Sequence, residues 1–360
     1  MSEKPTVLIT GVSGSLGLRL LDQLQEFRVV GAARHEPPAH ANLLVFEKLD
    51  LAEERSCEQL LALLRRHRPE ALVHLAFCSD PIRPDDRDRA RMWQANVAGT
   101  GRVIEAVAEH NRSLGTIDKF IYPSSATVYG AEAPKPVSED SPLQVQAFPF
   151  AQDKKETDLA IQSRARSLRD CATYLLRPQA YSGATAHNIL IGNFRGIPQR
   201  HGRLAERLRR RNSRLSVLLP SGDQYLEHKS QFVHLDDVAR LIAHILRRKR
   251  SDRKLSVMNV AGRGDPLSLR SCLQIAKAGL KRVPGRTIWK QSMLRLWDLG
   301  LSDVPPEALP FLLGSLTVDT SRLRIFLGEE YRSVIHFTSQ EALAETFADS
   351  IAPPELAIGK

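Results

Sequence analysis

The sequence predicts an α/β fold with a doubly wound parallel sheet, and two observations support this. Short aliphatic runs alternate with longer amphipathic stretches along the first half of the 360 residues, which is the pattern of repeated βαβ units. A glycine-rich segment at 11–17 joins the first aliphatic run to the first amphipathic stretch, where Rossmann-type sheets carry a phosphate-binding turn. We therefore expect ligands at the carboxyl ends of the strands.

The expected elements alternate in order along this half of the chain. Strands are expected at 7–10, 28–32, 71–76, 119–123 and 173–176. Helices are expected between and after them, at 16–27, 57–67, 90–109 and 154–168. This alternation predicts a sheet of about six parallel strands.

The pattern loosens after Arg177, where proline and glycine become more frequent. We expect a dinucleotide-binding domain over 1–178, a smaller substrate domain over 179–348 and a C-terminal tail over 349–360. Elements within about 230–262 are expected to return to the first domain; they are a strand at 232–234, a helix at 236–246 and a strand at 256–260.

Composition narrows the classes of protein that need to be considered. The chain is 42% hydrophobic and 26% charged, which is typical of a globular protein and excludes disordered and collagen-like chains. No apolar run approaches the roughly 18 to 20 residues of a membrane span, and no signal pattern precedes the first strand. We expect a cytoplasmic protein without a membrane partner. Its four cysteines have no metal-ligand spacing, so no metal site is predicted.

Basic residues are concentrated in one part of the sequence. The net charge is +10, and residues 195–254 carry all of it. Two clusters dominate this segment, Arg200–Arg214 and Arg247–Lys254. Each could form an anion site for a phosphorylated substrate or nucleic acid, or a solvated helix surface. The solvated surface is favoured for the second cluster, and nucleic acid is disfavoured because no aromatic residues interleave the arginines.

The glycine-rich segment predicts a dinucleotide-binding loop. Glycines allow a tight turn and a close approach of the backbone to a diphosphate, which the first helix then meets with its free N–H groups. A purely structural turn is the alternative. The expected cofactor-binding residues here are Gly11, Ser13, Gly14, Ser15, Leu16 and Gly17.

The end of the second strand favours NADP over NAD. In NAD-binding proteins an acidic residue at this place binds the ribose hydroxyls. Here the stretch Val30–His35 contains no acid and carries Arg34, which suits a 2′-phosphate. Alternatively, Arg34 stacks on the adenine or faces solvent.

Several ordered motifs together resemble the extended short-chain dehydrogenase/reductases, the NAD(P)-dependent epimerase/dehydratase family that acts largely on nucleotide-linked sugars. The glycine spacing of 11–17 is similar to that of the family. Four further segments resemble its adenine-contacting pair, fourth strand, central helix and active-site serine segment; they are Asp50-Leu51, His74-Leu75-Ala76, Asn96–Thr100 and Ser124–Gly130. A fifth, Phe232–Asp237, resembles its returning strand and helix. The resemblance implies that Asp50, Leu51, Leu75, Ala76 and Asn96 bind the cofactor.

The family uses a Ser or Thr, a Tyr, and a Lys four residues after the Tyr. The tyrosine moves the substrate's hydroxyl proton, and the lysine binds ribose and lowers the phenol pKa. The resemblance implies that Ser125 is the serine and Lys154 the lysine, whereas the tyrosine position holds Phe150. Phenylalanine keeps the ring and lacks the hydroxyl that transfers the proton.

Three interpretations of this substitution remain open. Another group could carry the proton; the candidates are Tyr129, Tyr181, His187, His228 and a water molecule held by Ser125. The chain could instead bind NADP as a catalytically silent regulator or scaffold. Finally, the reaction could begin at a group other than a hydroxyl, such as an activated double bond.

The substrate is also expected to differ from the family's usual ones. The Asp-Glu pair of the dehydratases is replaced by Ala126-Thr127, and Ser230 lies where sugar-nucleotide epimerases tend to place an arginine. Asn188, Arg195 and the first basic cluster could still bind a phosphorylated small molecule. We expect an NAD(P)-dependent oxidoreductase or epimerase-like enzyme. By resemblance, it pairs into a homodimer through helices at 90–109 and 149–168.

Overall fold

The computed structural model describes residues 4–79, 86–145, 147–199 and 202–348. Its largest feature is a seven-stranded sheet in the order β11-β6-β5-β4-β1-β2-β3, and all six strand pairs are parallel. The strands are β1 (Thr6–Thr10), β2 (Arg28–Ala33), β3 (Leu43–Lys48), β4 (Ala71–His74), β5 (Lys119–Pro123), β6 (Ala172–Pro178) and β11 (Leu255–Val260). The predicted doubly wound parallel sheet is confirmed.

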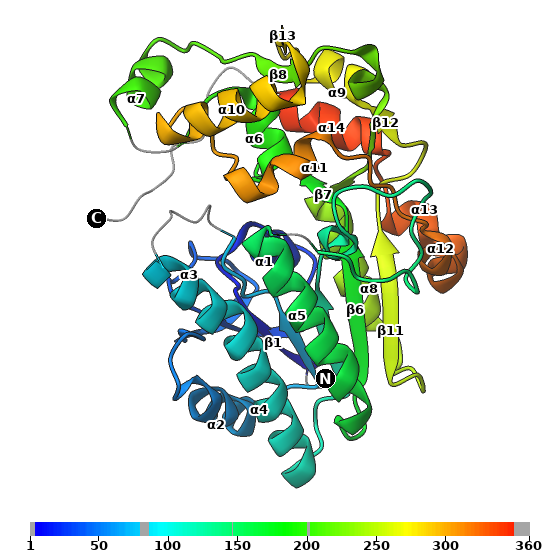
Figure 1. The fold of residues 1–360 in the computed structure, drawn as a ribbon. Helices are drawn as coiled ribbons and strands as arrows, with labels where there is room; N and C mark the ends of the chain where they lie inside the picture. The colour runs from blue at the N-terminus through cyan, green and yellow to red at the C-terminus, as the bar shows by residue number, and fades with distance from the viewer. Residues whose placement is uncertain (1–3, 80–85, 146, 200–201, 349–360) are drawn as a thin grey trace.

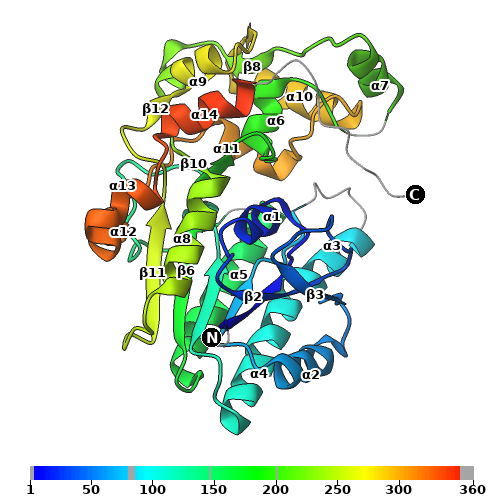
Figure 2. The same cartoon turned by 180° about the vertical axis from the view of Figure 1, so that it is seen from behind.

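Helices cover both faces of this sheet (Figures 1 and 2). One apolar layer contains side chains of α1 (Ser15–Leu21) and α8 (Leu235–Arg247), and the other contains side chains of α2 (Ser56–His67), α4 (Gly99–Ser113) and α5 (Pro149–Arg164). These layers form because parallel strands are buried on both faces and need two helical covers. No helix in the described ranges is both long and apolar enough to cross a membrane.

The structure corrects several predicted boundaries. The sheet has seven strands where we expected six, because β3 is an edge strand whose residues are at most partly buried and alternate weakly. The first helix ends at Leu21, because residues 22–27 form short turns instead of continuing it. The helix expected from Lys154 begins at Pro149, and proline is favoured in the first helical turn.

The long helix expected at 90–109 is a continuous helical segment in three parts. They are α3 (Asp86–Trp93), a π-helical turn at Gln94–Ala98 and α4. The π turn coincides with Asn96, whose side chain is buried and binds the loop after β4. A π turn inside a helix often marks a functional position.

The remaining elements form a smaller unit above the carboxyl ends of the main strands (Figure 1). Its strands lie in two-stranded sheets and are β7 (Ala180–Ser182), β8 (Val217–Pro220), β9 (Lys229–Ser230), β10 (Phe232–His234), β12 (Leu267–Ser268) and β13 (Leu280–Val283). Its main helices are α6 (Ile189–Arg195), α7 (Arg203–Arg210), α9 (Leu269–Ile275), α10 (Gly285–Asp298), α11 (Leu309–Leu313) and α14 (Ser339–Ala348). A separate apolar cluster fills it.

Two of the three expected returning elements join the large sheet and its helical cover. Strand β11 pairs with β6 in the main sheet, and α8 packs in the same apolar layer as α1. Residues 232–234 do not enter the main sheet; they form β10, which pairs with β7. The short helices α12 (Ser321–Leu327) and α13 (Tyr331–Val334) contribute side chains to the layer of α8. The tail at 349–360 lies outside the described residues.

Candidate functional site

The glycine-rich loop makes a tight turn at the carboxyl end of β1. Gly11 has a φ of +72°, and a Cβ atom there would lie 2.5 Å from the backbone nitrogen of Ala76. A Cβ atom on Gly17 would overlap the carbonyl oxygen of Val12. Only glycine fits these two positions, because one needs a left-handed backbone and both press against neighbouring backbone. The result is a cradle that a phosphate can approach closely.

The outer residues of this loop are open to solvent. Gly14 and Ser15 are exposed and Ser13 is half-buried, whereas Leu16 packs against the core beneath. Gly14 precedes α1 with extended backbone, and no side chain caps the helix. Free N–H groups at such a helix start suit an anion. The loop therefore has the geometry that the diphosphate of a dinucleotide needs, and its role in binding stays a prediction.

The other expected cofactor residues lie around the same sheet edge, but in different environments. Leu75 and Ala76 follow β4, beside Gly11. Arg34 follows β2, is exposed and has no ion-pair partner in the described structure. Asp50 is already held by Arg91 through an ion pair of 2.9 Å, and Leu51 is buried against Gly99.

Asn96 holds the segment after β4 through two hydrogen bonds to Cys78. Its amide accepts from the backbone N–H of Cys78 at 2.7 Å and donates to the carbonyl of the same residue at 3.0 Å. It also donates to the buried carboxylate of Asp153 at 3.0 Å. Arg89 binds that carboxylate through two hydrogen bonds. Asn96 therefore connects the edge of the sheet to the helix that carries Lys154.

Lys154 is buried, and two oxygen acceptors and one aromatic ring surround its ammonium group. Its Nζ donates to the carbonyl of Pro123 at 2.8 Å and to the hydroxyl of Tyr122 at 3.3 Å. The ring of Phe77 covers the same nitrogen, 3.7 Å from the ring centroid. Burial lowers the pKa of Lys154 to about 7, although Asp158 and Asp153 oppose the shift. This amine can gain or lose a proton near neutral pH.

Phe150 belongs to a group of packed aromatic rings. Its centroid lies 5.4 Å from that of Phe77 and 5.7 Å from that of Phe148. Phe148 in turn lies 5.5 Å from Phe311, on α11 of the smaller unit. The helix places residue 150 one turn before Lys154, and the ring packs against apolar neighbours. The position of the expected phenol is therefore filled by an apolar aromatic cluster.

Ser125 follows β5 and caps the short helical turn at Ala126–Tyr129. Its Oγ accepts from the backbone N–H of Thr127 at 3.2 Å and from the Thr127 hydroxyl at 2.9 Å. The neighbouring Ser124 donates to the carboxylate of Asp158 at 2.7 Å. The hydroxyl proton of Ser125 is not used in these bonds, so it can be donated to a ligand or a water molecule.

Tyr129 is fully engaged in a buried network. Its hydroxyl donates to Asn259 at 2.7 Å and accepts from Arg177 at 2.7 Å. Arg177 also holds Asp158 through two hydrogen bonds of 2.9 Å. Sequence reasoning missed this network, since its members come from four segments and form no local motif. Tyr129 is therefore a structural residue, and it is removed from the candidate proton carriers.

The other candidate proton carriers lie in separate places. Tyr181 is in β7 and packs against the apolar layer of α1 with Leu16 and Leu75. Burial raises its pKa. His187 is in the exposed segment before α6. His228 lines a recess in the smaller unit, and its Nδ1 is buried without a hydrogen-bond partner in the described structure.

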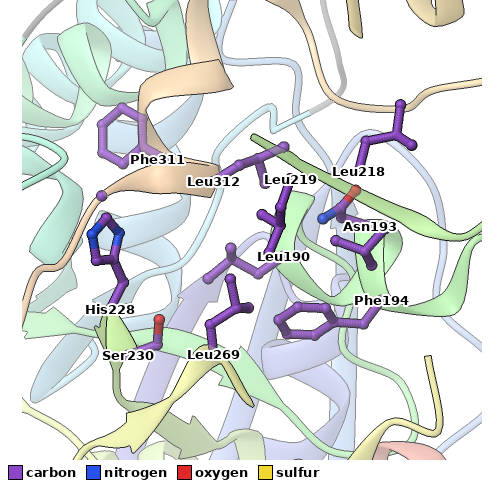
Figure 3. Close-up of a pocket in the computed structure, with 12 residues that line it drawn as sticks. Leu190, Asn193, Phe194, Leu218, Leu219, His228, Ser230, Leu269, Phe311 and Leu312 are labelled. Carbon is purple, nitrogen blue, oxygen red and sulfur yellow. The ribbon is translucent and has the colours of Figure 1, made fainter. Parts of the chain in front are cut away.

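That recess lies among α6, β8, β9 and α11 (Figure 3). Leucine side chains and the rings of Phe194 and Phe311 form most of its wall, and His228, Ser230 and Asn193 supply polar groups. None of its twelve lining residues is Lys or Arg. Phe311 belongs both to this wall and to the aromatic cluster, in which Phe148 lies between it and Phe150.

The two basic clusters differ in how their charges are compensated. In the second cluster Arg247 pairs with Glu26 and Arg250 with Asp170, and Arg248 donates to the carbonyl of Phe326. In the first, several arginines on and after α7 are exposed without an acidic partner in the described ranges; they are Arg203, Arg207, Arg210 and Arg211. Arg200 lies outside those ranges. The second cluster is a solvated surface whose arginines have partners, which is the alternative that the sequence favoured.

Phe77 and Tyr122 are site residues that sequence reasoning missed. Both contact Lys154, yet neither belongs to a motif of catalytic residues. Phe77 directly follows the segment His74-Leu75-Ala76, so its place at the end of a strand was the available signal.

Comparisons with known proteins agree with this geometry. The model of the NAD dependent epimerase/dehydratase family matches residues 7–261. The UDP-glucose 4-epimerase of Erwinia amylovora is 29% identical over 206 residues, or 54% of this chain and 58% of that protein. That of Drosophila melanogaster is 27% identical over 191 residues, or 48% of this chain and 52% of that protein. The chain thus spans about half the length of these curated relatives.

Solved structures with the same fold cover nearly the whole chain. MoeE5 in complex with UDP-glucuronic acid and NAD superposes with a TM-score of 0.64 at 19% identity, covering 95% of this chain and 98% of that one. The UDP-glucose 4-epimerase of Thermus thermophilus in complex with NAD gives a TM-score of 0.65 at 18% identity, over 95% and 98%. At such identity the likeness concerns the fold alone. Because the family model spans well over half of the sequence, the chain belongs to the NAD-dependent epimerase/dehydratase family.

Proposed function

We propose that the chain is an NAD(P)-dependent oxidoreductase or epimerase-like enzyme with an altered proton relay. Its substrate would be a sugar nucleotide or another molecule with a hydroxyl or ketone. One observation carries the proposal: a glycine cradle and a buried lysine lie at the same sheet edge, while residue 150 has no hydroxyl. The match of the family model to residues 7–261 supports it.

The coenzyme would lie across the carboxyl edge of the large sheet. Backbone groups of residues 11–17 would hold its diphosphate, and Arg34 would meet a 2′-phosphate. Asp50, which would lie at the adenine, is paired with Arg91. When bound, the nicotinamide would accept or donate a hydride. Lys154 would bind ribose once the Phe77 ring moves from its nitrogen.

Tyr181 is the proton carrier that the structure supports best. In the described structure no hydrogen bond of its hydroxyl is found, in contrast to Tyr129. Burial raises the pKa of Tyr122 most, Asp158 and Asp153 add to this, and Tyr181 adds the least, so the two phenols lie within electrostatic range of each other. Tyr122 contacts Lys154. We infer that the Tyr181 phenol, on the strand facing this edge, supplies the proton that Phe150 cannot.

The substrate would bind between the smaller unit and the carboxyl edge of the large sheet. The structures of relatives include complexes with UDP-glucose, which supports a sugar nucleotide. The two-domain division at about 178 would then separate coenzyme and substrate binding, with closure between them.

Two substitutions test the relay. With UDP-glucose or a candidate ketone, we expect slow hydride exchange in the natural chain and further loss of about a hundredfold or more in Tyr181→Phe, because a general acid or base contributes about that much. Tyr331→Phe is the matched control, since its hydroxyl is buried without a partner in the described structure and Tyr331 lies in α13 rather than in β7. Equal rates in Tyr181→Phe and the natural chain would reject Tyr181 as the carrier.

A catalytically silent NADP-binding protein is the second candidate, and one observation favours it. The Phe77 ring and two oxygen acceptors already occupy the Lys154 ammonium group. If the natural chain binds the coenzyme but transfers no hydride, while Phe150→Tyr gains activity, the silent protein is the correct assignment.

We also propose a cytoplasmic homodimer that pairs through the helical segments α3–α4 and α5. Trp93 and Leu159 support this surface, since 37% and 47% of these side chains are exposed on the two segments. Sedimentation analysis of Leu159→Glu would show monomers if the surface is correct, and unchanged dimers would contradict it.

A further inference from the structure

Two basic side chains lie together at the boundary between the large sheet and the smaller unit. Arg195 ends α6 and is half-buried, and His187 stands before the start of that helix. The only hydrogen bond of the Arg195 guanidinium in the described structure is a long one of 3.4 Å, to the carbonyl of Ala186. Burial lowers the pKa of Arg195, and no acidic side chain opposes this. Burial and Arg195 together lower the pKa of His187.

The same segment touches the glycine-rich loop. The hydroxyl of Ser15 donates to the carbonyl of Thr185 at 3.4 Å, across 170 residues of sequence. Thr185 is next to Ala186, to which Arg195 is bound. Arg195 is therefore bound to Ala186, and the residue before it, Thr185, contacts the glycine-rich loop. Figures 1 and 2 both place α6 in the smaller unit, on the side that faces α1.

A half-buried guanidinium without a counter-charge is unfavourable unless an anion or water meets it. Two other arginines that are buried or half-buried each have a carboxylate partner, since Arg177 has Asp158 and Arg89 has Asp153. Arg195 has five N–H donors and uses one of them weakly. A guanidinium fork fits two oxygen atoms of a phosphate group. The missing partner is therefore best supplied by a phosphate-bearing ligand between the two domains.

We propose that Arg195, with His187 beside it, binds the diphosphate of a dinucleotide or nucleotide ligand from the side of the smaller unit, opposite the backbone amides of the glycine-rich loop. This rests on the proposed function for the existence of such a ligand. The coenzyme is the favoured source, because the loop that Ser15 belongs to is the coenzyme cradle. Binding a diphosphate from both domains would also couple coenzyme binding to domain closure.

Calorimetric titration of the full chain tests this site with simple probes. Adenosine has no phosphate, ADP and NAD carry a diphosphate on adenosine, and UDP carries it on uridine. We expect Arg195→Ala to weaken ADP and NAD binding ten- to a hundredfold, because a charge-assisted hydrogen bond contributes about this much, and to leave adenosine binding unchanged. Arg195→Lys should retain part of the affinity. Arg270→Ala is the matched control, since Arg270 is exposed in the same unit and paired with Glu227.

The outcomes separate the site from the proposed function. If Arg195→Ala weakens UDP binding and leaves ADP binding unchanged, the diphosphate site stands and belongs to the substrate. If Arg195→Ala binds ADP, NAD and UDP as the natural chain does, with an unchanged unfolding midpoint, the inference is wrong. If the natural chain itself binds none of these nucleotides, the proposed function fails, which is a different result from normal binding by the variant.

Discussion

The two halves of the carboxyl edge of the large sheet differ in whether backbone or side chains determine their structure. The proposed coenzyme half is determined by backbone, because Gly11 and Gly17 leave no room for a Cβ atom. The proposed catalytic half is determined by side chains: Phe150 carries no hydroxyl, and Asp158, on the helix of Lys154, pairs with the buried Arg177. A loop that encloses a ligand with its backbone resists substitution, whereas one reactive hydroxyl can be lost without disturbing the helix that carried it.

The largest expected effect tests whether the scaffold of the catalytic half is intact. Asp158→Ala would leave the Arg177 charge buried without its partner, in a pair where both side chains are 1% exposed or less. We expect a loss of about 3 to 5 kcal/mol in the free energy of unfolding, measured by denaturant titration. Asp140→Ala is the control, because Asp140 is exposed. A loss below about 1 kcal/mol in Asp158→Ala would mean that the Arg177–Asp158 pair contributes little to the stability of this half.

The next effect tests the steric requirement of the coenzyme half. Gly11→Ala places a Cβ atom 2.5 Å from Ala76 and strains a φ of +72°. We expect a loss of about 1 to 3 kcal/mol from strain alone and loss of NADP binding by fluorescence titration. Gly101→Ala is the matched control, since a Cβ there meets nothing within 4 Å. In that helix alanine should stabilise the fold by about 1 kcal/mol. Equal behaviour of the two variants would contradict the comparison.

The third prediction uses the titration of Lys154. Its folded pKa of about 7 lies below the ordinary 10.5, so the unfolded chain binds the extra proton between these values. The free energy of unfolding should therefore rise with pH between these two pKa values. The destabilisation caused by the buried lysine should be largest below pH 7. We expect Lys154→Met to be more stable than the natural chain near pH 7, by more than about 1 kcal/mol, and the difference to shrink toward pH 10. A pH-independent difference would show that the lysine keeps an ordinary pKa.

The smallest effect concerns coenzyme choice. Arg34 is exposed and unpaired in the described structure, so it is free to bind a 2′-phosphate. Arg34→Ala should weaken NADP binding about tenfold, the value of one surface charge-assisted contact, and should change NAD binding little. Arg65→Ala, also exposed, serves as the control. Tighter binding of NAD than of NADP by the natural chain would overturn the preference.

Predictions from sequence were best where the pattern is local. The glycine spacing, the four-residue step from Phe150 to Lys154 and the aliphatic runs of the central strands all lie within one or two elements, and each has the expected placement. Strand β3 was missed because its side chains are only partly buried and give little periodicity. The end of α1 at Leu21 was missed because the apolar residues after it continue into turns that bury them without a helix.

The sequence by itself determined the parallel sheet, the glycine cradle and the absence of a hydroxyl at residue 150, because these follow from residue type and short-range spacing. Only the tertiary structure decided that Phe77 covers Lys154, that Tyr129 is held by Arg177 and that Arg195 lies near the loop of Ser15. These contacts join segments far apart in the chain. Their formation depends on how the layers pack, which no local pattern encodes.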